Sequence, residues 1–228
     1  MIGEIYLTDP DVVIKVKPNP RAKRLILRIS NRDGQPTVTV PLGASQTQVE
    51  TFVQNQRAWL RKHSKHITPP IILGYGDHIP LMGVPHELVL WQGKTIKAGD
   101  GVIAIPARKG DLAPRLKAYL KLLARDQLVP IAAETASNLG RQVSGYSFRD
   151  TRSRWGSCSS DGRLMFSWRL VMTPPAVLRY VAVHEACHLV EMNHSKRFWA
   201  LVAEQMPEYA SAQAWLRREG AHIQRIAL

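Results

Sequence analysis

The feature that most constrains this chain is the stretch HEACHLVEMNH at residues 184–194, which holds three histidines and two glutamates. Each residue of an α-helix advances by about 100°, so His184 and His188 would lie about 40° apart on one helical face. Both imidazoles could then reach one metal ion at roughly 2.0–2.1 Å. The spacing therefore predicts a helix that presents a pair of metal ligands.

Glu185 follows the first histidine directly, so it lies beside the pair without pointing at the same spot. This is the H-E-x-x-H arrangement, in which two histidines bind zinc and the glutamate is the general base. Zinc lowers the pKa of its water toward 7, and the glutamate takes the proton as the hydroxide attacks. We therefore predict a zinc-dependent hydrolase with Glu185 as its catalytic residue.

The alternative is a pair of exposed or hydrogen-bonded histidines on an ordinary helix. With eight histidines in 228 residues, the motif arises by chance in roughly one such chain in a hundred. Here it falls inside a helical pattern with a start signal at Thr173 and Pro174. The apolar positions of that pattern are Val177, Leu178, Val181, Leu189 and Val190. This context favours the metal site.

A catalytic zinc usually has three protein ligands and one open position, and two residues compete for the third place. Glu191 is seven residues past His184, on the same helical face, but three ligands on one straight helix would spread along about 10 Å. His194 becomes available if the helix ends near Asn193 and Ser195 caps the next one. We favour His194, and we interpret Glu191 as a residue that orients a ligand or as a solvated helix residue.

The chain divides into a β-rich front and a helix-rich rear, which predicts an α+β fold. Turn residues separate the front strands, which we expect to form an antiparallel sheet, and Ser45 is a candidate N-cap. We expect strands at 12–17, 24–30, 36–40, 78–91 and 94–105, with one helix over 45–64. In the rear we expect helices over 112–139 (interrupted near Pro130), 173–192, 196–206 and 208–219, with strand-like segments over 144–171. We place the domain boundary near 107–112, giving domains at 1–110 and 111–228.

The chain carries a strong positive charge. It has 31 Lys and Arg against 18 Asp and Glu, a net charge of +13 and a pI of about 10.1. This surplus favours anionic partners such as nucleic acid or phosphorylated substrates, and a protein that is merely basic is the alternative. Basic residues alternate with apolar and aromatic ones at 15–28 and 56–66, so nucleic acid is a candidate partner, although solvated strand and helix faces would look the same.

Membrane and secreted classes are not expected. No apolar run approaches the roughly 18 residues of a membrane helix, and the start MIGEIYLTDPDVVIKV does not resemble a signal peptide. The two cysteines, Cys158 and Cys187, make no disulfide framework. We therefore expect a cytoplasmic monomer.

The segment RWGSC lies just upstream of the histidine helix. Arg154 could hold an anionic group of a substrate there, while Trp155 fits a turn whose ring fills the core. No base in the sequence pairs with Cys158, so we do not expect it to act as a nucleophile. Arg154 is therefore the candidate substrate-binding residue of this segment.

Residues 150–209, from DTRSRWGSC to AEQMPEY, closely resemble the YgjP-like metallohydrolases, a family grouped with zinc metallopeptidases. The front segments RAKRLILRIS, TVTVPLGAS and VETFVQNQRAWLRKH also match. The pairing of RWGSC with H-E-x-x-H is similar to the SprT-like and WLM metalloproteases. The resemblance implies a zincin-like catalytic core behind a β-rich N-terminal part, with the family motif on His184, Glu185, His188 and His194.

The reading we favour is a zinc metallopeptidase acting on proteins or peptides. A nucleotide (UTP-type) pyrophosphohydrolase on the same site is the first alternative, because some relatives carry that label and the same chemistry suits it. The second alternative is a nucleic-acid-binding module with a structural metal. A structural zinc has four protein ligands, so coordination number separates it from the enzymes.

Overall fold

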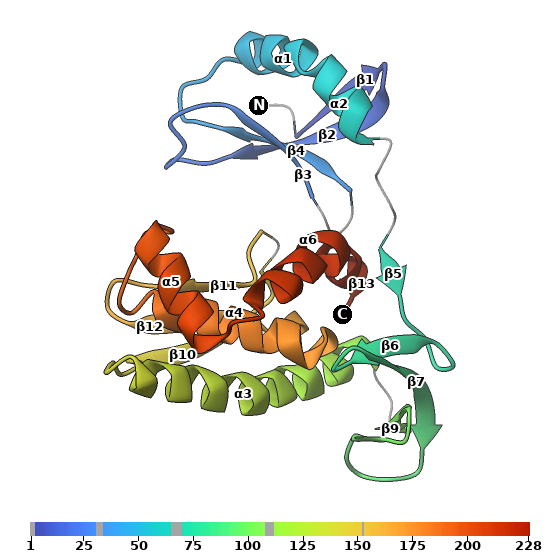
Figure 1. Ribbon diagram of the computed structural model, residues 1–228. Coiled ribbons are helices and arrows are strands. Elements are labelled where there is room, and N and C mark those ends of the chain that lie inside the picture. The colour runs from blue at the N-terminus through green and yellow to red at the C-terminus, as the bar shows by residue number, and fades with distance from the viewer. Residues whose placement is uncertain (1–2, 31–33, 65–69, 108–111, 152) are drawn as a thin grey trace. The chain divides into compact units, whose positions relative to one another are not determined.

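The computed structural model describes residues 3–30, 34–64, 70–107, 112–151 and 153–228 (Figure 1). The chain forms two compact units, Met1–Ile71 and Ile72–Leu228. The boundary predicted near 107–112 falls largely on residues 108–111, which lie outside the described residues. The α+β class is confirmed, with sheets in the N-terminal part and a helical C-terminal part that holds the histidine cluster.

The first unit is a four-stranded sheet with two helices packed on one face. Ser45 caps the first helix as predicted, since its side chain accepts from the Gln48 N–H and the Gln48 side chain accepts from the Ser45 N–H. The core joins Leu7, Ile14, Val38 and Val40 of the sheet to Val49, Val53 and Leu60 of the helices. The elements are β1 (Glu4–Thr8), β2 (Asp11–Pro18), β3 (Ile26–Ile29), β4 (Pro36–Val40), α1 (Gln46–Asn55) and α2 (Arg57–Ser64).

Two expectations for this unit were wrong, and one strand was not predicted. The strand order is β1-β2-β4-β3, and β2 runs parallel to β4, so the sheet is mixed rather than antiparallel. This happens because β3 passes to the edge and β4 then returns between β2 and β3. Strand β1 was not expected, and the single helix over 45–64 is two helices that meet at Gln56.

The second unit begins with a sheet of the same topology, in the order β6-β7-β9-β8 with β7 parallel to β9. Its two hairpins have two-residue turns, Met82-Gly83 and Asp100-Gly101, in which all four residues have positive φ. The Met82 N–H donates to the carbonyl of Val171, which ties the first hairpin to the helical part. The strands of this sheet are β6 (His78–Leu81), β7 (Val84–Trp91), β8 (Lys97–Gly99) and β9 (Val102–Pro106), and the short strand β5 (Ile71–Ile72), which precedes them in the chain, is not part of it.

Helix α3 (Leu112–Asn138) is continuous, so the expected interruption at Pro130 was wrong. A proline inside a helix removes one hydrogen bond and clashes with the preceding turn. Buried residues at helical spacing continue on both sides of it, among them Leu128 and Ala132. Packing of this stripe keeps the two halves in one helix, and α3 runs beside the shorter α4 (Figure 1).

A small three-stranded sheet and four helical segments complete the second unit. The sheet order is β10-β12-β11, with β11 at the edge beside α4. Helix α4 is buried on nearly all sides, which fits its largely apolar sequence. The elements are β10 (Gly145–Arg149), β11 (Gly156–Cys158), β12 (Arg163–Ser167), a 3₁₀ helix η1 (Trp168–Met172), α4 (Pro175–Cys187), α5 (Lys196–Gln205), α6 (Tyr209–Arg225) and β13 (Ile226–Ala227).

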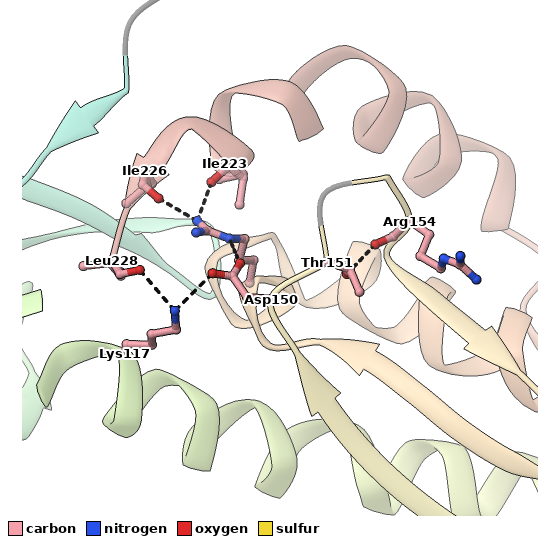
Figure 2. A network of polar contacts seen from close by, with 8 residues as sticks. Lys117, Asp150, Thr151, Arg154, Ile223, Ile226 and Leu228 are labelled. Atoms are coloured by element: carbon pink, nitrogen blue, oxygen red, sulfur yellow. Dashed lines mark hydrogen bonds and ion pairs between the residues drawn. The ribbon is translucent and has the colours of Figure 1, made fainter. Parts of the chain in front are cut away.

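A buried polar network ties the C-terminus to the rest of the second unit (Figure 2). The Arg169 guanidinium is fully buried, and its Nε donates to Asp150 Oδ1 at 2.8 Å. Lys117 Nζ donates to the other carboxylate oxygen of Asp150 at 3.1 Å. The two cations also donate to backbone carbonyls near the chain end, those of Ile223, Ile226 and Leu228. The network thereby holds α6 against α3 and against the start of the segment that leads to Arg154.

We expect Asp150→Asn to lower the free energy of unfolding by roughly 3 kcal/mol, because it leaves the buried Arg169 charge without this carboxylate. Urea denaturation followed by circular dichroism measures the loss. The control, Asp9→Asn, breaks the exposed pair with Arg61 and should cost less than about 1 kcal/mol. Equal losses in the two variants would contradict the special role of the buried pair.

Within the described residues, no helix is both long enough and apolar enough to cross a membrane.

Candidate metal centre

Helix α4 ends directly before the second histidine of the motif. The last helical residue is Cys187, and His188 is the C-cap with φ −65° and ψ −15°. Helix α5 begins after Ser195, whose side chain accepts from the Phe198 N–H at 3.3 Å, as predicted for an N-cap. His194 therefore lies on the connection between the two helices, and the turn brings it back to the other two histidines.

The three predicted histidines form one cluster. One ligand atom from each of His184, His188 and His194 lies within 4.8 Å of the others. The Nε2 atoms of His184 and His194 are 3.0 Å apart. No fourth His, Cys, Asp or Glu joins the cluster among the residues described, which leaves a set of three nitrogen donors.

Glu191 contributes to the cluster through its backbone. Because α4 ends at Cys187, Glu191 is not on the helical face that seven-residue spacing would give it, and its carboxylate is not part of the cluster. Its carbonyl oxygen lies 3.0 Å from His188 Nδ1. If Nδ1 carries the proton, this hydrogen bond orients the ring and leaves Nε2 free to bind a metal.

The electrostatics of the cluster favour neutral imidazoles. Burial, followed by the neighbouring His188 and His194, lowers the pKa of His184 to about 3. Burial also lowers the pKa of His188, against the raising effect of the hydrogen bond to Glu191. His184 Nδ1 is buried without a partner among the described residues. Neutral imidazole is the form that binds metals, so the donor set fits a metal ion that takes nitrogen ligands.

Aromatic rings surround the cluster, an arrangement that was not predicted from the sequence. Phe198, on the first turn of α5, is fully buried and stacks on His188 with ring centroids 4.4 Å apart. The same ring meets His184 and His194 edge-on at 4.9 Å. The only signal in the sequence was the position of Phe198 just after the predicted cap at Ser195.

Glu185 lies beside the histidines in a buried environment. It is 6% exposed, and burial raises the pKa of its carboxyl to about 8, an effect that Arg154 partly offsets. Gly156 of β11 makes room for it, because a Cβ at that position would lie 2.5–2.7 Å from the Glu185 side chain. Gly156 of the RWGSC segment therefore leaves the space that the Glu185 side chain occupies, and this contact depends on the fold and could not be predicted from the sequence.

A cavity of about 390 Å³ joins these groups. The three histidines and Glu185 line it together with all three residues of β11. Arg154, the predicted substrate-binding residue, also lines this cavity, and it is the only Lys or Arg among the lining residues that are described. The apolar part of the wall consists mainly of Trp155, Val181, Met192 and Leu216.

Two further residues that line the cavity are Tyr180 and Cys158. Tyr180 accepts a hydrogen bond from Gln213 Nε2 at 3.1 Å, and its ring meets His184 edge-on. Cys158 faces the cavity, but burial, followed by Glu185 and Asp161, raises the pKa of its thiol to about 11. A thiol in that state is a poor nucleophile, in agreement with the sequence analysis.

Comparison with known proteins identifies the family. No curated protein matches the chain at a significant level. Among solved structures, the chain is similar to the metallopeptidase zymogen abylysin of Pyrococcus abyssi, with 20% identity and a TM-score of 0.32 over 49% of this chain and 99% of that one. The model of the YgjP-like metallopeptidase domain matches residues 23–219. Since this match spans most of the sequence, including the whole histidine cluster, the chain belongs to the YgjP-like metallopeptidase-domain family.

Proposed function

We propose that the protein is a zinc-dependent peptidase in which His184, His188 and His194 hold the metal and Glu185 is the general base. The observation that carries the proposal is the set of three clustered histidine nitrogens beside a buried carboxylate in one cavity. Three donors with space for a fourth ligand are typical of catalytic zinc, whereas a structural site uses four protein ligands.

A zinc ion at this position would supply a Lewis acid that activates water and polarises the substrate carbonyl. Glu185 would accept the proton of the attacking water on its carboxylate and pass it to the leaving amine. Burial makes this carboxylate more basic, while the nearby Arg154 guanidinium favours its charged form. The Glu191 carbonyl keeps the His188 ring in place.

The cavity favours a peptide over a nucleoside triphosphate. Strand β11 lines it at the edge of its sheet, so an extended peptide could pair with this strand while its side chains meet the apolar wall. A triphosphate would need several cations around it, and the described lining offers only Arg154. The Arg154 guanidinium donates no hydrogen bond to the described residues, so it is available to one anionic group of a substrate.

The test compares substrates and metal states of the full chain. We expect the zinc-loaded protein to cleave an unfolded protein such as casein, to lose that activity on treatment with a chelator, and to regain it when zinc is added. Nucleoside triphosphates are assayed in parallel. Triphosphate hydrolysis without proteolysis would replace the peptidase by a pyrophosphohydrolase, and turnover of neither substrate would contradict the proposal.

A further inference from the structure

The sheet of the first unit has two unlike faces. Helices α1 and α2 cover one face, where Leu7, Ile14 and Val38 are buried. Side chains alternate along a strand, so the residues between these positions point to the other face. We call this surface the open sheet face, and its members are Tyr6, Val13, Lys15, Lys17, Ile26, Arg28, Thr37 and Thr39.

The strand register gathers three cations on this face. Lys15 lies opposite Thr37, and Thr37 lies opposite Arg28 on the next strand, so these three side chains form one row. Lys17 lies two residues further along β2, about 7 Å away, opposite Thr39. All three cations are exposed, and none of them forms an ion pair with the described residues. The face thus presents exposed cations separated by hydroxyl groups, and Glu4 of β1 lies opposite Lys15 at one end of the row.

The loop after β2 extends the positive charge. Arg21, Lys23 and Arg24 are exposed, and the Asn19 N–H donates to the Val40 carbonyl at 2.8 Å, which holds the loop at the end of the sheet where Lys17 lies. Residues 15–28 contain six Lys and Arg and no acidic residue. Among the described residues, the acidic side chains on this face are Glu4, which lies opposite Lys15, and Asp11 at the start of β2.

An aromatic ring shares the face with these cations. Tyr6 is 72% exposed, although it lies in a regular strand, opposite Val13. Its hydroxyl donates to Glu4 Oε2 at 3.1 Å, which restrains the side chain without covering the ring. An exposed ring beside basic side chains on a sheet is the combination that binds single strands, by stacking on bases and neutralising phosphates.

We propose that the open sheet face binds single-stranded nucleic acid, with Lys15, Lys17 and Arg28 contacting phosphates and Tyr6 stacking on a base. An acidic peptide would satisfy the cations but would leave the exposed ring without a role. The proposal concerns the first unit alone, and it stands whether or not the histidine cluster of the second unit is catalytic.

The test measures the affinity of the full chain for a labelled single-stranded oligonucleotide by fluorescence anisotropy at several salt concentrations. We expect Lys15→Glu with Lys17→Glu to weaken binding by at least about tenfold and to reduce the log–log salt slope by about 1.4, since each phosphate contact contributes about 0.7. The control is Lys62→Glu with Lys94→Glu, which makes the same charge change at exposed sites outside this face. It should have a much smaller effect.

The aromatic contact has its own variant. Tyr6→Leu should weaken binding by about fivefold or more through lost stacking, with an unchanged salt slope. Equal losses in the two double variants would show that net charge alone drives binding and would overturn the proposal. Tighter binding to a polyglutamate peptide, to an anionic vesicle or to duplex DNA than to the single strand would also overturn it. Because all substituted side chains are exposed, unchanged thermal unfolding confirms that each variant is folded.

Discussion

Replacing Glu185 by Gln should remove most of the hydrolytic activity and leave the metal in place. General base catalysis typically contributes roughly 10²–10⁴-fold, and glutamine cannot accept the proton. The side chain is buried and closely packed against Gly156, so an amide of the same shape fits where a smaller residue would leave a gap. Its carboxylate is not part of the histidine cluster, so zinc content should stay near one per chain. Casein cleavage and metal analysis on the same preparation measure both quantities.

The chain offers a matched control for this experiment. Glu191→Gln makes the same chemical change six residues away, and it preserves the backbone carbonyl that contacts His188. We expect this variant to keep both zinc and most of the activity. If Glu185→Gln retains activity close to that of Glu191→Gln, the glutamate of the motif is not the base, and the proposed mechanism is wrong even though the metal site stands.

The histidine cluster could be predicted because its determinants are local. His184 and His188 lie one helical turn apart, and the helix was visible in its apolar spacing. The position of His194 followed from a second local signal, the capping preference of Ser195, which predicted that a new helix begins there. Cap and spacing together placed the third histidine on a turn, and this turn is present in the structure.

The surroundings of the cluster depend on contacts between distant parts of the chain. Gly156 meets Glu185 only because the edge strand β11 packs beside α4, and no period in the sequence encodes that contact. The Asp150–Arg169 pair is likewise set by tertiary packing. The parallel pairing of β2 and β4 was missed for the same reason. Short strands separated by turns predict hairpins between neighbours in the chain, and nothing in the sequence indicates that β4 lies between β2 and β3.

Pro130 shows the limit of local rules in the opposite direction. The residue argues for a helix break on its own, but α3 buries apolar residues on either side of it. The packing of a 27-residue helix outweighs the loss of one hydrogen bond and one local clash. Local propensity therefore predicted where the helix begins and ends better than whether it is continuous.

Replacing His194 by Ala should lower zinc affinity by several orders of magnitude, because it removes one of three nitrogen ligands. Losing a residue that only orients a ligand typically costs about 10- to 100-fold, which sets the lower bound for this variant. His194 lies on the connection before α5, and its side chain is not needed for the cap at Ser195, so the fold should survive. Chelator competition at equilibrium measures the affinity, and circular dichroism checks the fold.

Two control variants test whether the loss of zinc affinity in His194→Ala is specific to the histidine cluster. His86→Ala removes a half-buried histidine of β7, distant in sequence from the motif, and should leave zinc affinity unchanged. Glu191→Gln should also have little effect, since its contact with His188 is made by the backbone. If Glu191→Gln loses more affinity than His194→Ala, the carboxylate is the third ligand, and the turn must then rearrange on metal binding. If His194→Ala and Glu191→Gln both keep the zinc affinity of the wild type, the metal is held by His184 and His188 without a third protein ligand from this turn.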